Sequence, residues 1–178
     1  GTYYGGSEDD RGKGCAVNAQ GDIFMTGETF STSQIATPGT YQTLPGGYED
    51  SFVARFYPNG IRKWGTYYGG SGTEFNYGCT LDRDGNLYTC GVTYSGNNIS
   101  TPGAYQVGAA GNGDAFLGKF SSDGQIVWGT YYGGNLAENG LGVCADTLNN
   151  IILVGNTKSH GGIATPGAHQ ENYGGNGP

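Results

Sequence analysis

The sequence predicts an all-β protein built from repeated four-stranded antiparallel sheets with no significant helix, and three observations lead to this prediction. The motif Gly-Thr-Tyr-Tyr-Gly-Gly occurs at residues 1–6, 65–70 and 129–134, so the chain repeats every 64 residues without insertion. Short apolar runs flank Asp-Gly steps, which are typical of β-hairpin turns. No segment of helix length has a 3.6-residue apolar period. A motif that recurs three times at the same spacing indicates three copies of one structural unit.

Each repeat predicts four short strands, as the second copy illustrates. Residues 79–81 and 86–91 form a hairpin around an Asp-Gly turn. A loop containing Thr-Pro-Gly leads to the third strand, residues 114–120, and a Ser-Asp-Gly turn leads to the fourth, residues 125–132.

The repeats divide the chain into units 1–64, 65–128 and 129–178, which together belong to one domain. The third unit stops where Asp50 and Asp114 begin the third strand of the earlier units. Repetition in register favours β-propeller blades over a sandwich, with the strand through residues 79–81 innermost and the strand through 128–132 outermost.

Three blades do not close a ring, because propellers typically have 4 to 8. Three explanations are open: a segment of a longer propeller, two chains that close one ring, or sheets completed by a strand of a neighbouring subunit in a filament. Residues 2–4 would then be an outermost strand at the start of the chain.

Composition excludes several classes of protein. The chain has 37 Gly and 6 Pro in 178 residues, but an aromatic share of 13% argues against disorder. The 8 Lys and Arg against 15 Asp and Glu give a net charge of -7, which offers no basic surface for nucleic acid. The sequence contains no run of roughly 18 apolar residues, the length that a membrane-spanning helix needs, so membrane insertion is not expected.

Enzyme signatures are missing from the sequence, which predicts a non-enzymatic protein without a cofactor. The two histidines, His160 and His169, do not belong to a metal-binding spacing, and neither a nucleophile elbow nor a phosphate-binding loop occurs.

A weak metal candidate is Asp82, Asp84 and Asn86, whose alternating oxygens resemble part of a calcium loop. No bidentate Glu follows at the spacing of an EF-hand, so a hairpin turn closed by an Asp side chain is the favoured alternative.

Acidic residues recur at two repeat positions. They could line a channel or a cation site, but hydrogen bonding to backbone N–H groups at turns is the favoured interpretation. The first position holds Asp10, Glu74 and Glu138, and the second holds Asp50 and Asp114.

Tyrosine pairs recur at a third position and are weak candidates for stacking on sugar rings. Adjacent residues of a strand face opposite sides of the sheet, so packing between blades is the favoured alternative. The candidates are Tyr3, Tyr4, Tyr67, Tyr68, Tyr131 and Tyr132.

Four cysteines, Cys15, Cys79, Cys90 and Cys144, allow three disulfide pairings. Cys79 and Cys90 would lie opposite each other if Asp84 and Gly85 formed a two-residue turn. They are therefore a weak disulfide candidate, and buried free thiols are the alternative.

The repeated motifs, Trp-Gly-Thr-Tyr-Tyr-Gly-Gly, Asp-x-x-Gly-Asn-x-Tyr, Gly-x-Thr, Thr-Pro-Gly-x-Tyr-Gln and Asp-Ala-Phe, resemble the SBBP-type β-propeller repeat. The resemblance covers essentially the whole chain, although in the third copy residues 145–150 lack the turn Gly and His169 replaces Tyr. It implies a secreted or cell-surface bacterial protein with a structural or adhesive role, whose partners are other blades, neighbouring subunits, or surface glycans and proteins. The alternatives are a glycan-binding module that uses rim tyrosines and a strand-complemented filament subunit.

Overall fold

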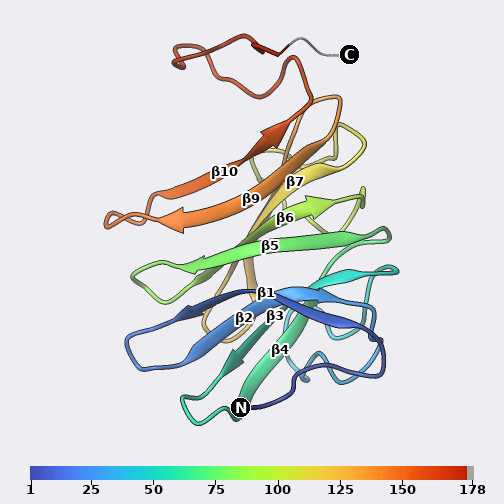
Figure 1. Ribbon diagram of the computed structural model, residues 1–178, viewed down its shortest axis with the longest axis vertical. Helices are drawn as coiled ribbons and strands as arrows, with labels where there is room; N and C mark the ends of the chain where they lie inside the picture. Colours follow the sequence, from blue (N-terminus) through green and yellow to red (C-terminus); the bar gives the residue numbers. More distant parts are fainter. Residues whose placement is uncertain (176–178) are drawn as a thin grey trace.

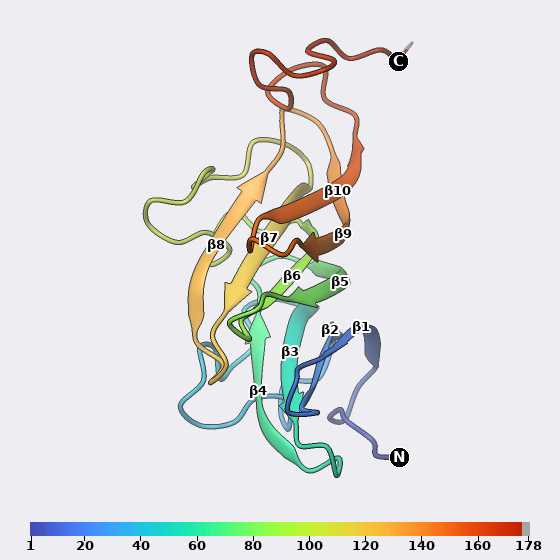
Figure 2. The same cartoon turned by 90° about the vertical axis from the view of Figure 1, so that its left-hand side faces the viewer.

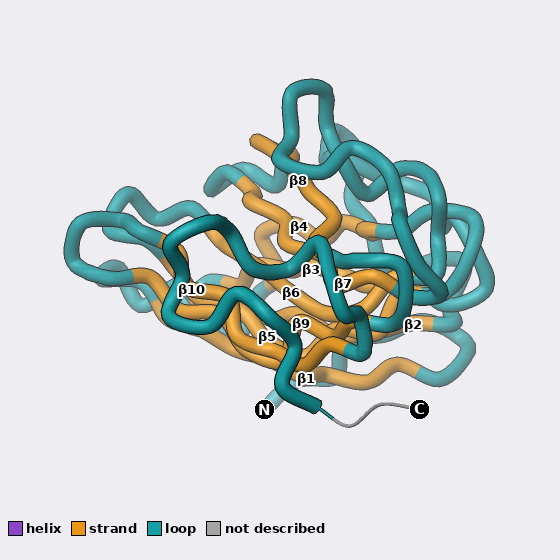
Figure 3. Tube along the Cα trace, turned by 90° about the horizontal axis from the view of Figure 1, so that it is seen from above, coloured by secondary structure: helices purple, strands orange, loops and turns teal. Residues whose placement is uncertain are grey.

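The computed structural model describes residues 1–175 and contains ten antiparallel strands in three sheets (Figure 1). Figure 3 shows strands and loops only, and no helix occurs within residues 1–175. The prediction of an all-β protein is therefore confirmed. The first sheet contains β1 (Asp10–Val17), β2 (Ile23–Thr29), β3 (Asp50–Phe56) and β4 (Arg62–Tyr68); the second contains β5 (Glu74–Leu81), β6 (Leu87–Thr93), β7 (Asp114–Phe120) and β8 (Ile126–Tyr132); the third contains β9 (Glu138–Ala145) and β10 (Ile151–Thr157).

The three sheets stack along the long axis of the molecule in chain order (Figure 1). Strand β1 lies beside β5 and β5 lies beside β9, so the first strand of each sheet is on one side of the stack. Strands β4 and β8 lie on the opposite side (Figure 2). The described sheets do not close into a ring.

Hairpin turns form where the sequence predicts them, because they place a residue with positive φ at the required position. Gly21, Gly85 and Gly124 have φ of 80°, 81° and 83°. In the third repeat, which lacks this Gly, Asn149 adopts a φ of 63°. Asn is among the few other residues that tolerate this region, so the turn is preserved without Gly.

The main apolar core lies between the first two sheets. Trp64 and Tyr68 of the first sheet pack with Phe116 and Phe120 of the second. The indole N–H of Trp64 also donates to the carbonyl oxygen of Ser122, 2.9 Å away. The core therefore combines aromatic packing with a directional bond between sheets.

The sheets do not coincide with the 64-residue sequence units, because each unit boundary falls in the last strand of a sheet. The boundaries after residues 64 and 128 fall within β4 and β8. Residues 2–4, expected as a strand, are not in a strand of the described chain. No helix of the described residues is long and apolar enough to span a membrane.

Candidate binding groove beside the third sheet

Three of the six tyrosines predicted as sugar contacts are not at the surface. Tyr67, Tyr68 and Tyr131 are at most 1% exposed. These three side chains are therefore not available to stack on sugar rings. Tyr68 packs against Phe116 and Phe120 of the second sheet, whereas Tyr67 packs on Ile35 and Phe52 of the first sheet and its loop. Tyr3 is fully exposed and makes no platform with Tyr4, whose ring packs on buried aromatic side chains.

The second tyrosine of each pair makes the same hydrogen bond to the sheet that follows it. The hydroxyl donates to a loop carbonyl 31 residues later, and in the second and third pairs this bond links one sheet to a loop of the next. The pairs are Tyr4 to Ile35 at 2.8 Å, Tyr68 to Ile99 at 2.7 Å and Tyr132 to Ile163 at 2.7 Å.

The candidate calcium ligands form a turn rather than an open set of oxygens. One oxygen of Asp82 accepts the backbone N–H groups of Asp84 and Asn86, at 3.0 and 2.8 Å. Its other oxygen accepts the Tyr88 hydroxyl at 3.1 Å and lies 3.3 Å from the Lys119 ammonium. Burial raises the pKa of Asp82, but these hydrogen bonds lower it more, so the net shift is downward. No group of three potential ligands gathers within residues 1–175.

Replacing Asp82 by Ala is expected to lower the free energy of unfolding by about 1–3 kcal/mol, because it leaves buried donors without an acceptor. The matched control, Asp84→Ala, removes an exposed carboxylate and should change it by less than about 0.5 kcal/mol. Urea denaturation measures both. An increase in Tm on adding calcium would contradict the interpretation as a turn.

The repeated acids accept backbone hydrogen bonds, as the favoured interpretation predicted. In each case the donor is the N–H group four residues earlier, so the carboxylate closes the loop before its strand. The pairs are Asp10 with Gly6, Glu74 with Gly70, Glu138 with Gly134, Asp50 with Gly46 and Asp114 with Ala110, at 2.6 to 2.9 Å.

The candidate disulfide is absent from the structure, in which all four cysteines are free. The turn pairs Leu81 with Leu87, one residue away from the register of a two-residue loop, so Cys79 lies opposite Thr89. Cys79 and Cys90 therefore point to opposite faces of the second sheet. Burial raises the pKa of Cys79 to about 11 and that of Cys90 to about 12.

Native alkylation is expected to modify two cysteines rapidly and two slowly. Cys15 and Cys144 are exposed, whereas Cys79 is partly buried and Cys90 is buried, and both have a raised pKa that suppresses the reactive thiolate. Mass spectrometry after iodoacetamide should show two added groups in the folded chain and four in the denatured chain, without reductant. Only two groups in the denatured, unreduced chain would indicate a disulfide.

A groove of about 1030 Å³ lies where the third sheet meets the outer half of the second. Its wall on the second sheet includes Leu117, Trp128 and Tyr132. Ile151 and Leu153 of β10 form the opposite wall. The lining is mainly apolar and includes several polar groups, as is usual for binding sites.

The groove occupies the position of a packed interface elsewhere in the molecule. By the 64-residue repeat, Trp128 and Tyr132 correspond to Trp64 and Tyr68. The latter pair is covered by Phe116 and Phe120 of the next sheet and is at most 7% exposed. Trp128 and Tyr132 are only half-buried, because the described third sheet has two strands.

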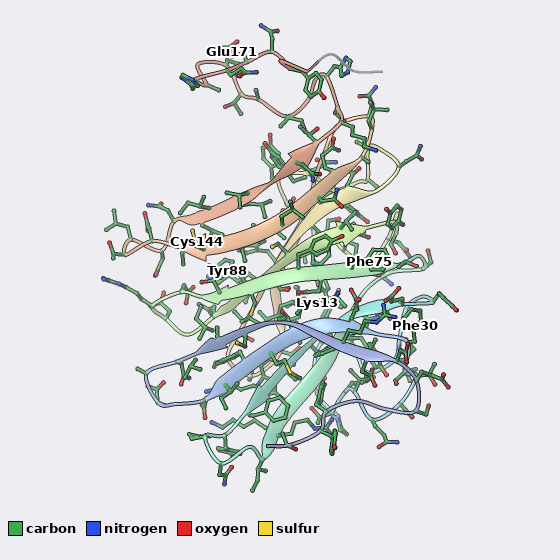
Figure 4. All side chains as sticks on the ribbon, viewed as in Figure 1. Lys13, Phe30, Phe75, Tyr88, Cys144 and Glu171 are labelled. Atoms are coloured by element: carbon green, nitrogen blue, oxygen red, sulfur yellow. The ribbon has the colours of Figure 1, made fainter. Side chains whose placement is uncertain are left out.

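Sequence reasoning missed a row of bulged residues on the first strand of each sheet. The register of β1, β5 and β9 shifts at one repeat position, leaving Lys13, Tyr77 and Leu141 without a partner. Figure 4 shows Lys13 on the side where β1 and β5 lie next to each other. Gly residues beside the bulge position were the only signal in the sequence.

No family model matches this chain, and the curated proteins contain no significant match to it.

Proposed function

We propose that this chain is a non-enzymatic structural or adhesive module of the SBBP type, whose sheets are blades of a β-propeller in a secreted or cell-surface bacterial protein. Its partners are further blades, supplied by the same polypeptide or by neighbouring subunits. Surface proteins or glycans would then bind to the assembled ring.

The observation that carries the proposal is the repetition of one contact between successive sheets. The hydroxyls of Tyr68 and Tyr132 bond carbonyls at the same repeat position, and Tyr4 makes this bond to the first sheet. Tyr4 thus occupies the place of an outermost-strand tyrosine of a preceding sheet. A single repeated relation between neighbouring sheets generates a ring where its rotation closes and an open array where it does not, and the resemblance to the SBBP-type repeat favours the ring.

The proposal is tested by measuring the mass of native particles with light scattering coupled to size exclusion, together with intact-chain mass spectrometry. We expect particles that contain at least four sheets, and negative-stain electron microscopy should show them as rings. A chain much heavier than 18.5 kDa would place the further blades on the same polypeptide. A chain of that mass within an oligomer would place them on neighbouring subunits. Isolated 18.5 kDa monomers as the only native species would overturn the proposal.

A further inference from the structure

A glycine in the second strand of each sheet provides a seat for a phenylalanine ring. Gly27 pairs with Phe52 and Gly91 pairs with Phe116, and each ring lies over its glycine. A Cβ atom on either glycine would be 2.7 Å from the ring and closer still, 2.1 and 1.9 Å, to a backbone carbonyl of the first strand, so only glycine fits beneath the ring. Gly155 holds the same position in the third sheet and lines the groove without a ring above it.

A second phenylalanine follows four residues later in both complete sheets. Phe120 packs against Tyr68 and Tyr41, with ring centroids 5.2 and 6.1 Å apart. The corresponding tyrosines of the next repeat, Tyr132 and Tyr105, line the groove. These two stack at an interplanar angle of 29°, whereas Tyr41 and Tyr68 are tilted at 63°. The groove therefore holds the tyrosines of this seat without the phenylalanine.

The strand beside the groove has an edge that its counterparts do not have. Strands β2 and β6 each pair on both edges, whereas β10 pairs only with β9 in the described chain. Its side chains Ile152 and Val154 are 42% and 59% exposed. An unpaired edge offers backbone N–H and C=O groups to an added strand.

We propose that the groove binds an extended polypeptide segment with the pattern Asp-x-Phe-x-x-x-Phe, which adds antiparallel to β10. Its first phenylalanine would lie over Gly155, and its second would lie opposite Ile151 against Tyr105 and Tyr132. The pattern is that of β3 and β7, Asp-Ser-Phe-Val-Ala-Arg-Phe and Asp-Ala-Phe-Leu-Gly-Lys-Phe, and their register defines the pairing. The inference deepens the proposed function and rests on it, because it treats the third sheet as a unit equivalent to the first two.

The test uses a fluorescent peptide with the sequence of residues 112–122, titrated with the 178-residue chain at concentrations where light scattering gives a monomer. We expect saturable binding by anisotropy, together with slower amide exchange in residues 151–157. A peptide with both phenylalanines replaced by Ala should bind at least about tenfold more weakly, because aromatic anchors dominate such interfaces.

Variants of the chain locate the site. Tyr105→Ala removes one side of the seat and is expected to weaken binding about tenfold. Tyr105 is 71% exposed, so the fold should be unaffected. The matched control, Tyr48→Ala, removes a 79% exposed tyrosine outside the groove and should leave binding unchanged.

Absence of binding, or equal binding of the two peptides, would overturn the inference. So would equal effects of the two tyrosine variants. The proposed function fails separately, through the mass of the native particle. If the chain formed rings but did not bind the peptide, the propeller proposal would stand and this docking mode would be rejected.

Discussion

Replacing Tyr68 by Ala is expected to lower the free energy of unfolding by about 3–5 kcal/mol, the usual cost of deleting a large buried ring. Tyr68 is fully buried at the contact between the first two sheets. Its ring packs edge-on against Phe116 and Phe120, with centroids 5.4 and 5.2 Å away. The hydroxyl donates to the carbonyl of Ile99. Truncation would therefore leave a cavity and an unsatisfied carbonyl in the same place.

Two further variants separate these causes in urea denaturation. Tyr68→Phe keeps the packing and removes only the hydroxyl, so it should cost about 1–2 kcal/mol. Tyr3→Ala removes a fully exposed tyrosine and should change the free energy of unfolding by less than about 0.5 kcal/mol. If Tyr68→Ala cost no more than Tyr3→Ala, the two sheets would not be packed through this residue.

The strands and turns could be predicted from the sequence because their signals are local. The hairpin around Asp84 and Gly85 depends on a glycine that adopts positive φ, and such a turn needs no distant partner. The exact register could not be predicted in the same way. A carboxylate at residue 82 closes a longer turn than the two-residue one, and one residue of register is enough to separate Cys79 from Cys90.

The groove could not be predicted from the sequence because it depends on how sheets cover one another. Tyr68 and Tyr132 are identical in local sequence, yet one is buried and the other lines the groove. The difference comes from strands that cover the first and are not in the described third sheet. The repeat period shows that Tyr68 and Tyr132 correspond, but only the structure shows which of the two is covered by strands of the next sheet.

The second large effect expected is a dependence of stability on pH that arises from Asp50. This carboxyl on β3 is 1% exposed and faces Glu74 on β5 of the next sheet. A Cβ atom at Gly69 would collide with an oxygen of each acid, so the two groups converge on one point. Glu74 accepts hydrogen bonds from Gly70 and two hydroxyls. Oδ1 of Asp50 has no donor of its own.

Burial raises the pKa of Asp50 to about 7. Hydrogen bonds from backbone N–H groups oppose this shift, and repulsion from Glu74 adds to it. Its unfolded value is near 3.9, so between pH 4 and pH 7 the folded chain holds a proton that the unfolded chain has lost. The resulting stabilisation is fully present below pH 4 and is lost as pH rises through 7. The loss is on the order of 2–4 kcal/mol.

Asp50→Asn is expected to remove this dependence, because the amide resembles the protonated acid in size and carries no charge. The free energy of unfolding of the variant minus that of the unmodified chain should rise by about 2–4 kcal/mol between pH 4 and pH 8. The control, Glu8→Gln, also removes one carboxylate but from an exposed position, and its difference should stay within about 0.5 kcal/mol. Urea denaturation at both pH values measures all three chains. A constant difference for Asp50→Asn would mean that Asp50 is ionised throughout this range. The cost of burying that charge would then have to be offset by hydrogen bonds such as that from the backbone N–H group of Gly46, 2.6 Å from Oδ2.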